Sequence, residues 1–292
     1  MINSQQPGKL YICGTPIGNL EDITLRSLKT LRKVDLIAAE DTRHTRKLLN
    51  HYHISKTLTS YHEFNKERKS HFILQCLKNG QNVALVSDAG MPGICDPGYE
   101  IINLVIQNHI PVIPVPGVSA LTAALVTSGF DISCFIFEGF IPKKKTEREQ
   151  FFSNLKEEKR TIIFYESPHR VKDTLAIIKT AMGNRRIVIN RELTKKFEEI
   201  KRGYISDIIN EISIQDIRGE ITLVLEGVRK KDNGVFPPAD GSENENEIKK
   251  KMINFLKKGY YNKDIVLLIT KEYHVPKNWV YQKILEHRNL EE

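Results

Sequence analysis

Three turns rich in glycine and proline follow predicted strands in the first half of the chain and could hold a small ligand. Their sequences are Cys13–Asn19, Ser87–Gly93 and Pro114–Ala120. Glycine lets a backbone approach a ligand closely, and proline fixes the path of a turn. Because open α/β sheets bind ligands beyond the carboxyl ends of their strands, three such turns on one sheet predict a single crevice. Ordinary strand-to-helix connections would use the same residue types, so that alternative stays open.

These turns match neither of the two commonest nucleotide-binding motifs. The sequence has no GxxxxGK[ST] loop, and Gly14–Gly18 does not fit GxGxxG. No CxxC or mixed cysteine and histidine spacing occurs, so we predict no metal site. The four cysteines, expected to be small buried hydrophobic residues, are Cys13, Cys76, Cys95 and Cys134.

The elements that must position these turns alternate between short apolar runs and amphipathic stretches. This pattern predicts a parallel sheet covered by helices on both faces. The expected strands are Leu10–Cys13, Leu36–Ala39, Val83–Val86 and Pro111–Val115. The expected helices are Thr24–Arg32, Thr42–His51, Tyr99–Asn108 and Ser119–Thr127.

A second α/β unit begins near Phe130, and its order of elements predicts a mixed sheet. The expected strands are Phe135–Glu138, Thr161–Tyr165, Arg186–Asn190, Lys201–Tyr204 and Glu220–Leu225. The expected helices are Thr146–Lys156, Val171–Thr180 and Ile205–Ile212.

The last part of the chain predicts a polar linker and a small helical module. The linker contains Pro237 and Pro238. Three short helices, Glu247–Lys258, Asn262–Tyr273 and Lys277–His287, then predict a helix-turn-helix-like module, with a plain packing or dimerisation appendage as the alternative. The predicted boundaries are 8–128 for the first α/β domain, 129–228 for the second, 229–246 for the linker and 247–292 for the module.

Charge and hydropathy restrict the class of protein. The formal net charge is +8, which favours a polyanionic partner, although a solubilising surface charge would give the same value. No apolar run reaches membrane-spanning length. The stretch from Met1 to Lys9 is polar and lacks a signal-peptide core, so we expect a cytoplasmic protein without a membrane partner.

Several segments, in order along the chain, closely resemble the ribosomal RNA small subunit methyltransferase I family. This family belongs to the tetrapyrrole-methylase-like class of S-adenosylmethionine enzymes (class III). The matching segments are Thr15–Leu20, Ala39–Arg43, Ser60–Glu63, Ser87–Gly90, Asp96–Gly98, Phe164–Arg170, Arg191–Lys196 and Arg218–Glu220.

The resemblance implies a 2′-O-methyltransferase for one cytidine in the decoding region of 16S rRNA. The implied fold has two α/β domains with the S-adenosylmethionine cleft between them, in a homodimer. The implied cofactor-binding residues are Pro16, Ile17, Asp88, Ala89, Gly90, Met91, Ser119, Ala120, Tyr165, Leu193, Glu220 and Ile221. In the tetrapyrrole enzymes the corresponding loop is richer in glycine and ends in Asp. Thr15–Asn19 departs from that pattern, which argues against a tetrapyrrole substrate.

The implied chemistry places two demands on side chains. Methyl transfer from a cationic sulfur needs in-line positioning, and Asp88 is a plausible partner for the cofactor's positive groups or else a turn cap. A ribose hydroxyl also needs a group that accepts its proton or stabilises the alkoxide. The sequence does not choose among the candidates, each of which could sit in a structural ion pair: Glu40, Asp41, Arg43, Glu63, Glu166, His169, Arg170, Arg191, Glu192 and Lys195.

An RNA substrate also needs positive charge near the cleft. The predicted RNA-contacting residues are Lys143, Lys144, Lys145, Arg148, Arg170 and Lys195. A solvated charge run is the alternative for the lysines. Two other functions stay open at this point: a tetrapyrrole C-methyltransferase of the same fold, and a non-catalytic RNA-binding or ribosome-assembly factor.

Overall fold

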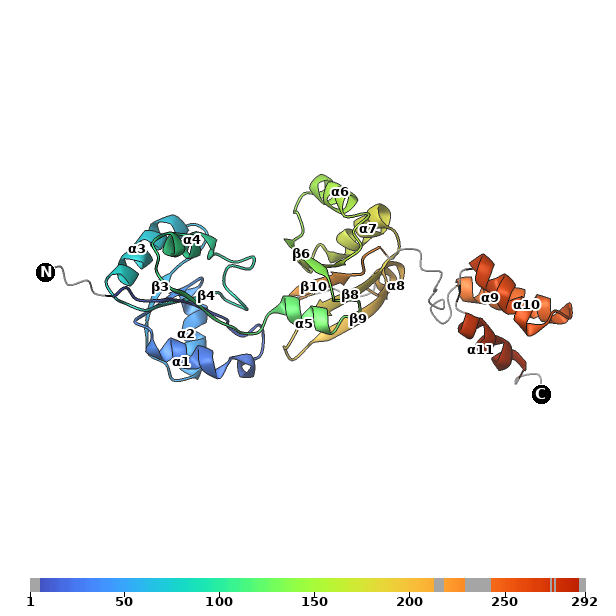
Figure 1. Cartoon of the computed structure of the whole chain (residues 1–292), viewed down its shortest axis with the longest axis horizontal. Helices are drawn as coiled ribbons and strands as arrows, with labels where there is room; N and C mark the ends of the chain where they lie inside the picture. Colours follow the sequence, from blue (N-terminus) through green and yellow to red (C-terminus); the bar gives the residue numbers. More distant parts are fainter. Residues whose placement is uncertain (1–5, 213–217, 229–242, 274, 276, 289–292) are drawn as a thin grey trace. The chain divides into compact units, whose positions relative to one another are not determined.

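The computed structural model describes residues 6–212, 218–228, 243–273, 275 and 277–288. The chain forms two compact units, Met1–Val228 and Arg229–Glu292 (Figure 1). Within the described residues, the first unit contains two five-stranded sheets and the second contains three helices.

The first sheet is entirely parallel, in the order β3-β2-β4-β1-β5. Its strands are β1 (Leu10–Cys13), β2 (Leu36–Ala39), β3 (Thr57–Ser60), β4 (Val83–Val86) and β5 (Val112–Val115). The central strands β2 and β4 are buried along their whole length, as their continuous apolar runs predict. The short 3-10 helix η1 (Leu20–Asp22) follows β1.

Helices cover both faces of this sheet (Figure 1). One apolar cluster joins the sheet to α3 (Lys66–Lys78) and α4 (Tyr99–Gln107), with Ile73 and Ile101 fully buried. Another joins it to α1 (Leu25–Lys33) and α2 (Thr42–His51) through Leu31 and Leu49. The sequence did not predict β3 or α3, because β3 carries two threonines and a serine and α3 begins with a run of polar residues.

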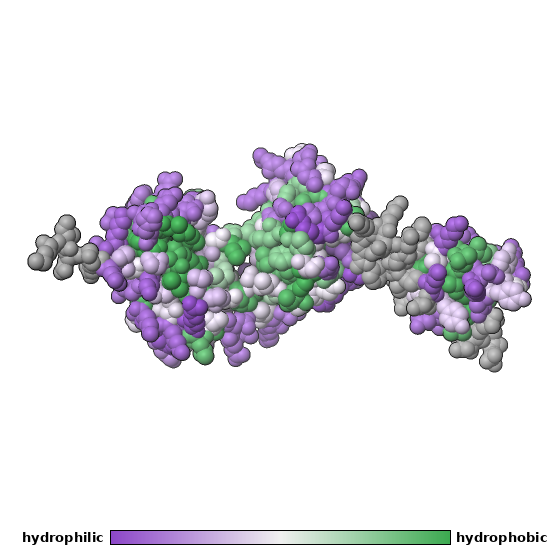
Figure 2. Space-filling view, viewed as in Figure 1, coloured by the Kyte–Doolittle hydropathy of each residue, from purple (hydrophilic) through white to green (hydrophobic). Residues whose placement is uncertain are grey.

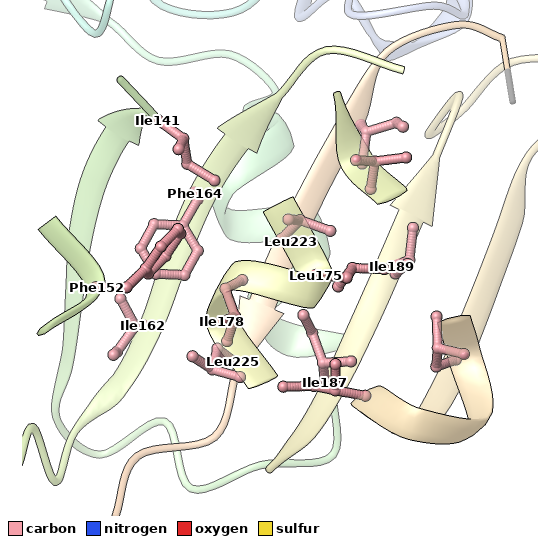
Figure 3. Packing of buried hydrophobic residues seen from close by; sticks show 14 of the residues in the cluster. Ile141, Phe152, Ile162, Phe164, Leu175, Ile178, Ile187, Ile189, Leu223 and Leu225 are labelled. Carbon is pink, nitrogen blue, oxygen red and sulfur yellow. The ribbon is translucent and has the colours of Figure 1, made fainter. Parts of the chain in front are cut away.

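The second sheet is mixed, in the order β6-β7-β10-β8-β9. Its strands are β6 (Phe135–Phe140), β7 (Thr161–Glu166), β8 (Arg186–Arg191), β9 (Glu199–Tyr204) and β10 (Ile221–Leu225). Only β6 and β7 pair in parallel among these strands of the described chain. The helices α6 (Lys145–Asn154), α7 (Val171–Met182) and α8 (Ile205–Ile212) pack on one face and bury Ile208 there. Phe152 and Leu175 lie in the same core (Figure 3).

Helix α5 (Ala120–Val126) connects the two sheets structurally. The sequence assigned it to the first domain, but Ala124 and Leu125 pack against Ile163 and Val224 on the other face of the second sheet. The turn that precedes α5 follows β5 of the first sheet. The turn Pro114–Ala120 therefore begins at the first sheet and ends in a helix that packs on the second sheet.

The second unit has its own apolar core. Its helices are α9 (Glu243–Lys257), α10 (Asn262–Tyr273) and α11 (Lys277–Arg288), and they bury Ile269 and Ile284 between them. Helix α9 begins four residues before the predicted start at Glu247, inside the predicted linker. Residues 229–242 of that linker, including its two prolines, lie outside the described residues.

The cysteines only partly match the expectation of buried hydrophobic residues. Cys13 is buried and Cys76 is half-buried, whereas Cys95 and Cys134 are exposed. The prediction is wrong for these last two, because both lie in connections rather than in strands or helices. Among the described residues, no helix is long and apolar enough to cross a bilayer.

Candidate active site

The turns that follow β1, β4 and β5 meet at the carboxyl ends of their strands. The backbones of Thr15 and Gly90 exchange hydrogen bonds of 2.9 and 3.1 Å, and the Thr15 hydroxyl donates to the Ser87 carbonyl at 3.1 Å. A Cβ placed on Gly14 would lie 2.7 Å from the Cα of Gly117, closer than real Cβ contacts. Glycine is therefore required for the turns after β1 and β5 to touch.

A cavity of about 400 Å³, which we call the inner cavity, lies where these turns face the second sheet. The first domain contributes Ile17, Asp88 and Met91, and the second contributes Tyr165 and Glu220. The remaining lining residues are Glu40, Ala89, Gly90, Ile94, Cys95, Asp96, Ser119, Ala120, Phe140, Glu166, Ser167, Pro168, Gly219, Ile221 and Thr222. All but two of the residues expected to bind the cofactor therefore surround one space.

The two exceptions are Pro16 and Leu193, which do not line the inner cavity. Leu193 is 8% exposed and packs in the same apolar cluster as Ile17. Its side chain does not line the inner cavity, so a direct contact of Leu193 with the cofactor stays a prediction.

Three carboxylates gather at one end of the inner cavity: Glu40, Asp88 and Asp96. The Asp88 amide donates to Glu40 Oε2 at 3.3 Å, and the Asp41 amide donates to Asp88 Oδ1 at 3.1 Å. Burial raises the pKa of Glu40, partly opposed by the hydrogen bond from the Asp88 amide. Burial, with the nearby charge of Glu40, raises the pKa of Asp96 to about 6. This end of the cavity therefore attracts cations.

Sequence reasoning missed Asp96. The segment Asp96–Gly98 contributed to the family resemblance, but no pattern marked its carboxylate as different from the other acids of the chain. Its burial and its proximity to Glu40 depend on how the connection between β4 and α4 folds, and that is a tertiary property.

A more open hollow of about 700 Å³, which we call the outer hollow, adjoins the inner cavity. Glu40, Cys95 and Asp96 line both spaces. The other lining residues of the outer hollow are Asp41, Thr42, Arg43, Ser60, His62, Glu63, Phe64 and Pro97. Arg43, a candidate from the sequence, forms a fork-like pair with Asp41 (Nη2 to Oδ2, 2.7 Å) and leaves most of its side chain in solvent.

Glu166 and Arg170, two further candidates, belong to a buried network. Glu166 is 3% exposed, and its Oε2 accepts a hydrogen bond from the Thr174 hydroxyl at 2.6 Å. Arg170 pairs with Glu166 and also donates to the carbonyl of Pro142 at 3.1 Å. These contacts fix the end of β7 and the start of α7, so both residues position the cavity wall.

Arg148 is a correction to the predicted RNA surface. Its side chain is 6% exposed, and its Nη1 donates to the Thr174 hydroxyl at 3.1 Å. Helix α6 turns this arginine inward, so it is not available to a phosphate. The neighbouring Lys144 and Lys145 are exposed and form surface ion pairs with Glu147 and Glu149 at 2.9 and 4.0 Å.

Glu192 does not line the inner cavity, but its side chain fixes Glu220, which does. Its Oε1 accepts from the Glu220 amide at 2.8 Å and from Lys195 Nζ at 2.9 Å. Gly219 has a φ of +95°, and a Cβ there would lie 2.4 Å from Glu192 Oε1, so this packing requires glycine. Arg191 pairs with Glu199 at 3.0 Å.

His169 does not fit the role proposed for it from the sequence. Its side chain is exposed and lines neither the inner cavity nor the outer hollow. The described residues also contain no group of three or more His, Cys, Asp or Glu side chains arranged to hold a metal ion.

Comparisons with known proteins agree with this architecture. The family model for tetrapyrrole (corrin/porphyrin) methylases matches residues 9–209. Uroporphyrin-III-C-methyltransferase from Thermus thermophilus has the same fold, with a TM-score of 0.53 at 18% identity over 74% of this chain and 94% of that one.

Proteins related in sequence identify the family more narrowly than the fold does. Ribosomal RNA small subunit methyltransferase I of Halalkalibacterium halodurans is 43% identical over 274 residues, which is 94% of this chain and 93% of the relative. The protein of the same name from Thermotoga maritima is 52% identical over 220 residues, covering 75% of this chain and 99% of the relative. This chain therefore belongs to the ribosomal RNA small subunit methyltransferase I family, within the tetrapyrrole methylases.

Proposed function

We propose that this chain transfers a methyl group from S-adenosylmethionine to the 2′-hydroxyl of a cytidine in the decoding region of 16S rRNA. The observation that carries the proposal is the inner cavity with its acidic end, in a chain of this family. The test is transfer of labelled methyl from S-adenosylmethionine to purified small ribosomal subunits, compared with protein-free rRNA.

The residues around the inner cavity fit the cofactor. The volume of about 400 Å³ falls in the range of about 300–1,000 Å³ common for small-molecule sites. Ile17, Met91 and Tyr165 supply apolar walls, and Tyr165 is held edge-on against Phe140 with ring centres 5.4 Å apart. Asp88 and Glu40 supply negative charge for the amino group and the sulfonium. When bound, the cofactor supplies a methyl group on a positively charged sulfur.

The protein's own contribution is positioning and charge. The contact of Gly14 with Gly117 joins the turns after β1 and β5, and the hydrogen bonds between Thr15 and Gly90 join the turns after β1 and β4, so the three walls support one another. Preformed walls reduce the entropy lost in aligning the reactants. The carboxylates at the acidic end attract the positive groups of the donor and hold it in place.

The RNA would meet this site through positive charge on the second domain. Lys143, Lys144 and Lys145 lie just before and at the start of α6 and are exposed. Lysines of this kind contact phosphates without reading the bases, so they orient the substrate rather than select it. Lys195 is held by Glu192 and Glu220, which leaves it less free to bind phosphate.

The sequence relatives favour an rRNA substrate over a tetrapyrrole. The relatives named as rRNA methyltransferases are 43% and 52% identical, whereas the tetrapyrrole enzyme of known structure is 18% identical and supports the fold alone. A non-catalytic RNA-binding factor would bind no cofactor, and calorimetry with S-adenosylmethionine separates that function from catalysis.

We also infer a cytoplasmic homodimer that acts on the small subunit. A 16S rRNA substrate requires a location where ribosomes assemble. Figure 2 shows an apolar area over α4, a helix on which Ile106 is 55% exposed, and exposed apolar area of this kind is typical of a protein interface. Light scattering should give twice the mass of one chain.

A further inference from the structure

The outer hollow has no assigned role in the binding of the cofactor. It opens beside the inner cavity, and the two spaces share Glu40, Cys95 and Asp96 as a common wall. A group held in the outer hollow would therefore reach the acidic end of the inner cavity. That is the relationship that a methyl acceptor must have with a methyl donor.

The composition of the outer hollow suits a nucleotide. Phe64 presents a ring that is 97% exposed, with His62 near its edge at 6.2 Å between ring centres. An exposed aromatic ring at the mouth of a hollow is a platform on which a base can stack. His62 lines the hollow beside this ring, and its Nε2 lies 3.0 Å from Asn65 Nδ2, which fixes the imidazole next to the platform.

The shared wall is built on a constrained backbone. Cys95 has a φ of 62°, an uncommon conformation for a residue other than glycine. Its sulfur lies 3.1 Å from the position that a Cβ on Gly139 would occupy, so the connection after β4 packs against the end of β6 in the second sheet. This packing holds Asp96 in place between the two spaces.

Asp96 and Glu40 are both partly buried carboxylates that accept a hydrogen bond. The Asp88 amide donates to Glu40 Oε2 and the Ser87 side chain donates to Asp96, and each bond partly opposes the effect of burial on the pKa of its acceptor. The pKa of Asp96 is raised to about 6, so its carboxylate is ionised at neutral pH and yet basic enough to take a proton. The titratable groups that interact electrostatically with Asp96 are Glu40, Asp88, Cys95 and Tyr165. The other titratable residues that line the two spaces are Asp41, Arg43, His62, Glu63, Glu166 and Glu220.

We propose that the outer hollow receives the nucleotide to be methylated, with its base stacked on Phe64, and that Asp96 accepts the proton of its 2′-hydroxyl. This inference rests on the proposed function. As the ribose oxygen forms its new bond to the methyl carbon, the O–H bond breaks and its proton passes to Asp96. The electrons of the broken carbon–sulfur bond stay on the sulfur of the donor, which leaves as a neutral thioether.

The first experiment measures methyl transfer to unmethylated small subunits by Asp96→Asn across pH 5 to 9. We expect kcat to fall by about 100-fold or more, as is typical for loss of a general base. The wild-type increase of kcat with pH, centred near about 6, should disappear. Asp96→Glu, which keeps a carboxylate, should retain part of the rate and the acid limb. Asp207→Asn on α8, an exposed residue outside both spaces, is the matched control and should behave as wild type.

The second experiment measures binding of Phe64 variants to small subunits without cofactor. Phe64→Ala should weaken binding by about 5-fold to 100-fold, the range expected for loss of base stacking. Phe64→Tyr should restore it. Phe72→Ala removes another exposed ring, on α3 and outside the hollow, and should leave subunit binding unchanged.

The outcomes separate this inference from the proposed function. A wild-type protein that transfers no methyl to small subunits would contradict the proposed function itself. An active wild type combined with unchanged kcat and pH dependence in Asp96→Asn would overturn the role of Asp96. If Asp96→Asn instead loses S-adenosylmethionine affinity in proportion to its rate, Asp96 binds the donor and the inference is again wrong. If Phe64→Ala binds small subunits as tightly as wild type, the nucleotide does not stack on Phe64 in the outer hollow.

Discussion

Glu166 and Arg170 form an ion pair with 2.5 Å between Oε1 and Nη2 across the connection from β7 to α7, and the Glu166 side chain is fully buried. Removing one partner of a buried pair leaves an uncompensated charge, which costs about 3–5 kcal/mol. Arg170→Met should therefore lower the free energy of unfolding by about that amount in urea denaturation. Lys179→Met, at an exposed position of the same helix, should change it by less than about 0.5 kcal/mol. Equal effects of the two variants would show that Arg170 does not position the fold.

Asp88 carries a prediction that separates charge from turn geometry. Its carboxylate accepts the Asp41 amide and also lines the inner cavity. Asp88→Ala should weaken S-adenosylmethionine binding by about 10-fold or more, the effect of losing a hydrogen bond to a charged group. Asp88→Asn keeps an oxygen for the Asp41 amide but loses the charge, and it should weaken binding similarly. If calorimetry finds wild-type affinity for S-adenosylmethionine in Asp88→Asn, the charge of Asp88 does not contribute to cofactor binding and the residue only stabilises the turn.

Asp96 should lower the stability of the folded protein at neutral pH. Its pKa is about 6 in the folded protein, above its ordinary value of 3.8, so the folded state binds this proton more tightly than the unfolded state. Stability from this group is therefore present at low pH and is lost as pH rises through about 6. Asp96→Asn, which stays neutral, should raise the free energy of unfolding at pH 7.5 by about 1–3 kcal/mol.

The measurement for this prediction is urea denaturation of wild type and Asp96→Asn at several pH values. The gain in stability should grow between about pH 4 and pH 7. Asp207→Asn is again the matched control and should show no such growth. A variant that is less stable than wild type at pH 7.5 would mean that the ionised carboxylate of Asp96 is well satisfied in the folded protein.

The exposed lysine run tests how the RNA is attracted. Each phosphate contact releases counterions, so binding to small subunits should weaken steeply with salt. Changing Lys143, Lys144 and Lys145 to Gln should lower the slope of log affinity against log salt by up to roughly three units, with cofactor affinity unchanged. The control replaces Lys29, Lys33 and Lys47, exposed on α1 and α2, and should change the slope less. Identical slopes for wild type and the Lys143–Lys145 variant would make the run a solvated surface.

The sequence predicted those elements whose pattern is local. The buried strands β2 and β4 are continuous apolar runs, and α2, α8 and α10 begin and end at the predicted residues. The edge strand β3 was missed because three of its four residues are polar and only Thr59 is buried. Local pattern also could not show that α5 would pack on the second sheet.

The same distinction between local pattern and tertiary packing applies to the site. The turns were predicted because glycine and proline mark them, and their meeting follows from the parallel order of the strands. Arg148 was assigned to the surface because it follows three lysines, but its guanidinium reaches Thr174 on the next helix. Asp96 was missed because its burial and its neighbour Glu40 come together only in the folded chain.

The methylated product identifies both the substrate and the acceptor atom. Purified protein, labelled S-adenosylmethionine and unmethylated small subunits should give label in one nucleotide of 16S rRNA, which digestion and mass spectrometry should identify as 2′-O-methylcytidine. Asp88→Ala should lower the yield at limiting cofactor. Label on a base, label on a tetrapyrrole but none on rRNA, or S-adenosylmethionine binding without any transfer to subunits would contradict the account.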